Sequence, residues 1–154
     1  MNKKGFTLIE LLAVIVILAI ILLIAMPIVL NVIQEARRGA FQSTSQGMVK
    51  TAETEFYRRS LSESPSELYY VFNDGTQTTH DVELEESDEP ILEYSGQAPD
   101  NGVIHVASNG DIVMWLHDDT HCATKTVAQT EPVVSDDDLA ACAAIVSLPL
   151  SGFE

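Results

Sequence analysis

The first 27 residues read MNKKGFTLIELLAVIVILAIILLIAMP, and every residue from Leu11 to Met26 is apolar. About 20 apolar residues in a helix span the hydrocarbon core of a bilayer, so this stretch can cross a membrane once. Lys3 and Lys4 precede it, and basic residues favour the cytoplasmic side of a membrane. The sequence therefore predicts one membrane-spanning helix with a cytoplasmic N-terminus and an outward-facing remainder.

Two residues interrupt the apolar stretch. Glu10 places a carboxylate near its beginning, and an unpaired charge at the centre of a membrane helix costs about 2.5–3.5 kcal/mol on insertion scales. We therefore expect Glu10 to have a partner; the alternative is that it reaches headgroup water at the cytoplasmic interface. Pro27 removes a backbone donor and crowds the preceding turn, which predicts a kink or local unwinding.

A secretory signal peptide is an alternative interpretation of this N-terminus. Such peptides are cleaved after the apolar stretch, at small residues in an A-x-A-like pattern. The segment Ala25-Met26-Pro27 matches that pattern poorly, and no polar region follows the apolar run. The sequence therefore favours a helix that is retained.

Residues 4–10, KGFTLIE, resemble the processing and assembly signal of type IV pilins and related pseudopilins. The resemblance is close over about residues 1–60 and only architectural beyond them. It implies that a membrane aspartyl peptidase cuts between Gly5 and Phe6 and N-methylates the new Phe6 amine. Gly5 suits a cleavage site because a residue without Cβ lets the backbone enter a tight cleft.

The same resemblance implies roles for the two interrupting residues. The carboxylate of Glu10 would meet the N-terminal amine of a neighbouring subunit during assembly. The region around Pro27 would loosen as subunits leave the membrane and pack into a filament. An ordinary kink at the membrane edge is the alternative for Pro27.

The chain is expected to have four parts: a leader peptide (1–5), a membrane or filament-core helix (6–30), an amphipathic continuation (31–60) and an acidic globular head (61–154). An apolar stripe at helical spacing supports the continuation to about Ser60. Its members are Ile33, Ala36, Ala40, Met48, Ala52 and Phe56.

Beyond residue 60 the pattern predicts loops and short antiparallel strands. The dipeptides Asp74-Gly75 and Asn109-Gly110 are hairpin signals between β-rich runs. We expect strands over residues 68–72 and 76–79 around the first turn, and over 103–106 and 112–116 around the second. Residues 122–128 could add a third strand to the second hairpin; 60–66 form a loop, 82–89 a loop or edge strand, and 91–94 a short strand or turn.

The C-terminal region has the signals of a short helix. Ser135 is a candidate N-cap, followed by Asp136, Asp137 and Asp138 in the first turn, where the helix dipole favours anions. Residues 139–146 would form the helix, ending before Pro149. The expected fold class is therefore α+β: a long N-terminal helix packed on a small antiparallel sheet, with a short C-terminal helix.

Charge is distributed unevenly along the chain. Residues 1–60 hold seven Lys/Arg and four Asp/Glu, whereas residues 61–154 hold one Lys and 19 Asp/Glu. A head with a net charge of −18 repels phosphate, so it is not expected to bind nucleic acid. Heads would also repel one another, so polymerisation must be driven by the apolar helix. On the helix, Glu35 with Arg38 and Glu55 with Arg58 or Arg59 have the spacing of ion pairs.

Cys122 and Cys142 both lie in the outward part, where a disulfide is chemically permitted. Many type IV pilins close their C-terminal region with a disulfide, so the resemblance suggests this bond; two separate buried thiols are the alternative. His80, His105, His117 and His121 have no zinc-ligand spacing with the cysteines, and no calcium-loop or catalytic pattern is evident. We therefore predict a protein that is not an enzyme and has no metal or cofactor.

These features predict the precursor of a structural subunit of an extracellular type IV pilus. It would be a single-pass membrane protein before assembly and part of the pilus afterwards. Its partners would be copies of itself in a helical filament, other pilins, the prepilin peptidase, the assembly machinery and the membrane. The alternatives are a pseudopilin of a secretion or DNA-uptake system and, in a different class, a membrane-anchored binding ectodomain.

Overall fold

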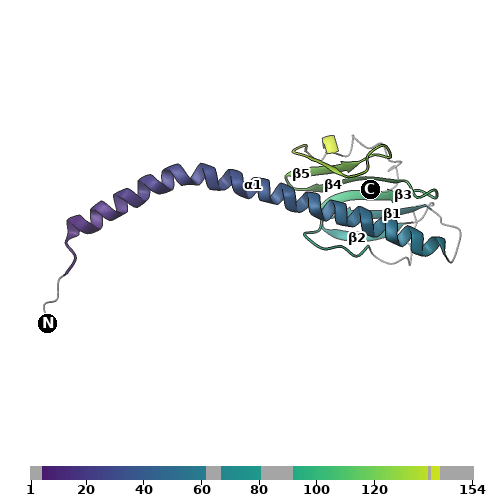
Figure 1. Cartoon of the computed structure of the whole chain (residues 1–154), viewed down its shortest axis with the longest axis horizontal. Helices are drawn as coiled ribbons and strands as arrows, with labels where there is room; N and C mark the ends of the chain where they lie inside the picture. Colours follow the sequence, from purple (N-terminus) through teal and green to yellow (C-terminus); the bar gives the residue numbers. More distant parts are fainter. Residues whose placement is uncertain (1–4, 62–66, 81–91, 139, 143–154) are drawn as a thin grey trace. The chain divides into compact units, whose positions relative to one another are not determined.

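The computed structural model describes residues 5–61, 67–80, 92–138 and 140–142. The chain divides into two compact units, Met1–Arg37 and Arg38–Glu154. One helix, α1 (Leu8–Ser60), makes up most of the first unit and continues into the second (Figure 1). The predicted long N-terminal helix is thus confirmed, although it begins at Leu8 rather than at Phe6.

From Leu11 to Leu30 the helix is apolar on every side. The large apolar side chains from Leu8 to Ile33 are exposed within this chain. A helix that is hydrophobic all round is normally buried in a protein core or a membrane. This part of α1 therefore needs an environment that the chain itself does not supply.

The second unit contains an antiparallel sheet, which confirms the predicted fold class (Figure 1). Its strands lie in the order β2-β1-β3-β4-β5-β6. They are β1 (Leu68–Asn73), β2 (Thr76–His80), β3 (Asn101–Val106), β4 (Ile112–Asp118), β5 (His121–Lys125) and β6 (Val133–Ser135).

Both predicted hairpins are present. Strands β1 and β2 pair around Asp74-Gly75, and β3 and β4 pair around Asn109-Gly110. Gly110 has a φ of 91°, and a Cβ on it would lie 2.9 Å from a ring carbon of Phe56. Glycine at this position therefore provides both the left-handed backbone and the space that α1 occupies.

The prediction for residues 122–128 was correct in type but wrong in extent. Strand β5 ends at Lys125 because the chain turns there. The backbone N–H of Gln129 donates to the Thr126 carbonyl at 3.0 Å, and the Gln129 side chain accepts from the Thr126 N–H at 2.7 Å. The chain then returns as β6, an edge strand that we did not predict. Of the predicted 91–94 segment, the described residues 92–94 form neither a strand nor a turn.

Helix α1 packs on one face of the sheet through residues 41–56. The buried helix positions are Phe41, Thr44, Ser45, Met48, Val49 and Ala52, and Phe56 is partly buried against the same core. They lie opposite the inward side chains of the sheet, among them Ile104, Met114 and Leu116. The spacing of three and four residues between the buried positions is that of one helix face.

The predicted apolar stripe was therefore right from Met48 onward and wrong before it. Ile33, Ala36 and Ala40 are exposed, Ile33 at 44%. The face that is buried contains Thr44 and Ser45, two small polar residues that an apolar template passes over. Thr44 also lies against a bend outside the strands: a Cβ on Gly96 would lie 2.1 Å from Thr44 Oγ1.

The opposite face of the sheet carries a second, smaller apolar cluster. It consists of Tyr69, Val103, Trp115, Cys122 and Cys142, all of them buried. Cys122 belongs to β5, and Cys142 is helical together with residues 140 and 141. These three residues are the described part of the predicted C-terminal helix.

The predicted N-cap of that helix was wrong by three residues. Ser135 belongs to strand β6 instead. The cap is Asp138, whose carboxylate accepts the Ala141 N–H at 2.8 Å and whose carbonyl accepts the Cys142 N–H at 2.8 Å. Aspartate caps as well as serine does, so sheet pairing of residues 133–135 decides between the candidates.

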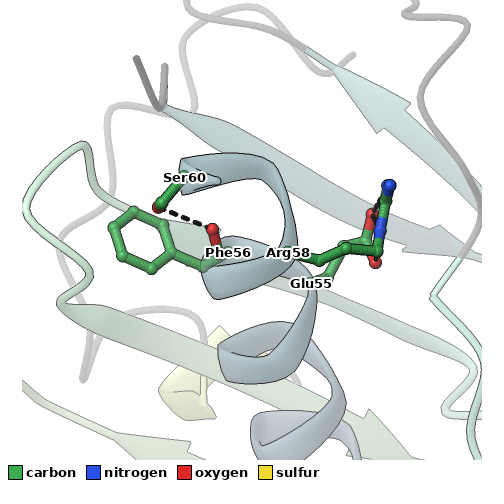
Figure 2. Close-up of polar contacts among 4 residues, drawn as sticks. All are labelled: Glu55, Phe56, Arg58 and Ser60. Atoms are coloured by element: carbon green, nitrogen blue, oxygen red, sulfur yellow. Dashed lines mark hydrogen bonds and ion pairs between the residues drawn. The ribbon is translucent and has the colours of Figure 1, made fainter. Parts of the chain in front are cut away.

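The end of α1 is held by contacts within the helix (Figure 2). Glu55 forms the predicted ion pair with Arg58, whose Nε donates to both carboxylate oxygens at 3.1 and 2.9 Å. The Ser60 hydroxyl donates to the Phe56 carbonyl at 2.7 Å. Arg38 was expected to pair with Glu35; its guanidinium instead donates to the Val134 carbonyl at 2.7 Å and so ties β6 to the helix.

The core supports a direct test of helix packing. Met48 is fully buried, so Met48→Ala should lower the free energy of unfolding by about 2–5 kcal/mol through lost burial and a cavity. Val127→Ala, at a position that is 58% exposed, should change it little. Urea unfolding of the full chain in detergent micelles, followed by Trp115 fluorescence, measures both. Equal effects of the two substitutions would contradict this packing.

Candidate functional site

The predicted cleavage site lies on an irregular segment ahead of α1. Gly5, Phe6 and Thr7 have no regular secondary structure, and the Phe6 side chain is 88% exposed. No atom lies within 4 Å of a Cβ built on Gly5. Exposed, irregular segments are the preferred sites of proteolysis. The Gly5–Phe6 bond is therefore accessible to a peptidase as the chain stands.

Glu10 is held by Thr7 at the beginning of the helix. Glu10 Oε2 accepts the Thr7 backbone N–H at 2.8 Å and the Thr7 hydroxyl at 2.7 Å. The Glu10 N–H in turn lies 3.3 Å from Thr7 Oγ1. This reciprocal pair is a capping box, in which two unpaired donors of the first helical turn are satisfied together.

Thr7 is the residue that our sequence interpretation missed at this site. The signal was present, because Thr7-Leu8-Ile9-Glu10 fits the S/T-x-x-E pattern that marks a helix beginning. We considered Glu10 only as a charge in an apolar stretch that needed a distant partner. The structure shows that a nearby partner exists in the same chain.

The helix that follows Glu10 is suited to a membrane. By its length and composition, α1 contains a stretch that could span one. Helix α1 continues without interruption through Pro27. The role of Pro27 as a kink stays a prediction.

The two cysteines are joined. A disulfide links Cys122 on β5 to Cys142, with the Cα atoms 5.5 Å apart. Of the two alternatives that the sequence left open, the structure has the bonded one. The bond ties the beginning of the C-terminal helix to the sheet face opposite α1.

Two of the histidines, His105 and His121, form small structural contacts. His121 Nδ1 lies 3.0 Å from an oxygen of Asp118, and His105 Nε2 lies 3.4 Å from an oxygen of Glu67. The His105 ring stacks on Tyr69 with a centroid distance of 4.4 Å. Among the described residues, no group of three His, Cys, Asp or Glu is placed to hold a metal ion.

Carboxylates gather at one end of the sheet. The Asp100 N–H donates to the His117 carbonyl at 2.9 Å, which brings Asp100 close to the turn that follows β4. Burial raises the pKa of Asp100 above its ordinary value of 3.8, and the nearby charges of Asp119 and Asp118 raise the pKa further. This end of the sheet therefore concentrates negative charge.

A groove lies beside β6 in the second unit, between α1 and residues 128–134. Its cavity of about 530 Å³ is lined by polar groups including Arg38, Gln42 and Glu131. The residues that line it include no histidine, cysteine or serine. Its lining is polar, with one hydroxyl, that of Thr130, and one carboxylate, that of Glu131.

Comparison with known proteins identifies the N-terminal segment. Residues 1–26 match the model of the prokaryotic N-terminal methylation motif, which is the type IV prepilin signal. The long helix on an antiparallel sheet is also the arrangement of type IV pilins. No curated protein and no solved structure matches the chain. The motif supports a precursor of the pilin or pseudopilin type and implies processing by a prepilin peptidase.

The disulfide should contribute strongly to the stability of the second unit. A loop with a sequence separation of 20 residues is closed by this bond, and the chain-entropy model assigns about 3 kcal/mol to a loop of that size. We expect Cys122→Ala/Cys142→Ala to lower the free energy of unfolding by that amount. Urea unfolding with and without reductant tests this: reductant should destabilise the natural protein and leave the double variant unchanged.

Asp100 should make stability depend on pH. Because its pKa is higher in the folded state, its ionised form destabilises the fold, and stability should increase as the pH falls through that raised pKa. Asp100→Asn should therefore raise the melting temperature at pH 7. The difference from the natural protein should disappear below pH 3.8, the ordinary value for the group. If Asp100→Asn raises stability by the same amount at every pH, ionisation of Asp100 is not the cause of the difference.

Proposed function

We propose that this chain is the precursor of a structural subunit of an extracellular type IV pilus. The observation that supports the proposal most is the prepilin signal at residues 1–26. In this proposal residues 1–5 are the leader and residues 6–30 form the membrane and filament-core helix. Residues 31–60 continue the helix, and residues 61–154 form the head.

Processing would occur at the exposed Gly5–Phe6 bond on the cytoplasmic side of the membrane. Cleavage removes Lys3 and Lys4 together with the leader and leaves one amine, that of Phe6, at the end of an apolar helix. N-methylation of this amine by the same peptidase keeps its positive charge. The mature subunit then carries one cation and one carboxylate, Glu10, at the beginning of its apolar stretch.

Assembly would pair Glu10 of one subunit with the Phe6 amine of its neighbour. In surroundings of low dielectric, opposite charges attract strongly, and a carboxylate without its partner is penalised strongly. An incoming subunit is therefore pulled into register with the one added before it. The apolar surface of residues 8–33, exposed within a single chain, would be covered by the same neighbours.

The head would coat the filament. Its net charge of −18 over residues 61–154 opposes close packing of heads and keeps the surface soluble. Its partners would be copies of this chain, other pilins and the assembly machinery. A catalytic role and nucleic-acid binding by the head are not part of this proposal.

A pseudopilin remains the second candidate, because the same N-terminal motif serves both classes. The two differ in filament length: a pilin forms long surface filaments, and a pseudopilin forms short ones. Electron microscopy of cells expressing this chain distinguishes them. A membrane-anchored ectodomain of another class would form no filament and would keep its leader.

Two substitutions test the proposal. Gly5→Arg should block processing, because a bulky charged side chain then precedes the cleaved bond. Glu10→Ala should permit processing but reduce filament yield at least tenfold, since loss of one member of a buried pair costs about 3–5 kcal/mol. Glu53→Ala, which removes an exposed carboxylate from the same helix, is the matched control.

Mass spectrometry of the membrane-bound protein measures processing, and sheared filaments measure assembly. The natural chain should begin with methylated Phe6. An intact Met1 on the natural chain would overturn the proposed function. Normal filament yield from Glu10→Ala would overturn the pairing of charges while leaving processing in place.

A further inference from the structure

The two oxygens of the Glu10 carboxylate have different surroundings. Oε2 accepts two hydrogen bonds from Thr7, one from the backbone at 2.8 Å and one from the hydroxyl at 2.7 Å. Within the described part of the chain, no hydrogen bond to Oε1 is found. The carboxylate is therefore fixed on one side and available on the other.

We propose that Thr7 is a positioning residue for assembly, which holds Glu10 through Oε2 and leaves Oε1 for the amine of the neighbouring subunit. This inference rests on the proposed function, because it assumes the pairing of Glu10 with that amine. It adds that the hydroxyl of Thr7, and not only the charge of Glu10, determines how readily the pair forms.

The physical reason is preorganisation. A glutamate side chain has three rotatable bonds, and ordering them opposes any contact that it makes. Two hydrogen bonds to Thr7 order Glu10 before a neighbour arrives, so less freedom is lost when the ion pair forms. The capping box also fixes the beginning of α1 at Leu8, two residues after Phe6, which would carry the amine.

The hydroxyl also has a role before assembly. In the membrane-stored chain Glu10 has no neighbouring amine, and its charge lies in an otherwise apolar segment. The two donors of Thr7 partly satisfy the carboxylate during storage. Because only Oε2 is used, they do not have to be displaced when the neighbour's amine approaches Oε1.

Thr7→Val and Thr7→Ser form a matched pair of variants. Valine keeps the branched shape and the backbone N–H but lacks the hydroxyl, whereas serine keeps the hydroxyl. We expect Thr7→Val to reduce filament yield per mature subunit by about two- to tenfold, the effect of leaving one side chain unordered. Thr7→Ser should restore yield to near the natural value. Thr54→Val, which removes another helix hydroxyl, is the control and should assemble normally.

The readouts separate this inference from the proposed function. Cleavage after Gly5 is measured first by mass spectrometry, and filament yield is normalised to mature subunit. If the natural chain is not cleaved, the proposed function and this inference fail together. If it is cleaved and Thr7→Val assembles normally, or Thr7→Ser assembles as poorly as Thr7→Val, the positioning role alone fails.

A spectroscopic measurement tests the contact itself. In detergent micelles, the amide proton of Thr7 should resonate downfield in the natural chain, because it donates to a carboxylate at 2.8 Å. Glu10→Gln should move this resonance upfield, and Glu53→Gln should not. A Thr7 amide that is insensitive to Glu10→Gln would show that the hydrogen bond is absent, and the proposal would be wrong.

Discussion

Helix α1 has to satisfy two different surroundings along one backbone. Apart from its ends and the turn before Pro27, the backbone hydrogen bonds of α1 are made within the helix. Side chains therefore decide what each part can contact. From Leu8 to Ile33 the large apolar side chains are exposed, whereas from Phe41 to Ala52 the buried positions occupy one face only. The first part therefore suits surroundings of hydrocarbon or other helices on all sides. The second part suits a sheet on one side and water on the other. The position of the head along the chain follows from where this change occurs.

The compact second unit, Arg38–Glu154, has a core of its own. The helix face from Phe41 to Phe56 and the inward residues of the strands form one core, and the disulfide joins a second cluster on the opposite face of the sheet. Most of the acidic side chains that the structure describes are exposed. At Asp100, burial first and the nearby charges of Asp119 and Asp118 second raise the pKa. A head of this composition has little tendency to associate by itself. If subunits polymerise, the attraction must come from the apolar part of α1 and from the charges at its beginning.

The sequence was informative where one physical signal dominated, and misleading where two competed. The long apolar stretch predicted a helix and Asn109-Gly110 predicted a hairpin, and both are present. At the C-terminal region Ser135 and Asp138 both suit an N-cap, and only the pairing of β6 with β5, a contact between distant residues, selects Asp138. Thr44 and Ser45 are buried on the packed face of α1 although they are polar, which no apolar pattern reveals. At the N-terminus, Glu10 gives two signals: its charge in an apolar stretch indicates a distant partner, and its position three residues after Thr7 indicates a helix cap.

That capping pattern affects how the N-terminal end would act after processing. Since Thr7 is the N-cap, Phe6 lies outside the helix, where the chain departs from helical geometry. The carboxylate nearest to the new amine in the same subunit is then already hydrogen-bonded to Thr7 through one oxygen. In the proposed assembly the other oxygen of that carboxylate would accept the amine of a neighbouring subunit, and the two hydrogen bonds of the cap would stay in place.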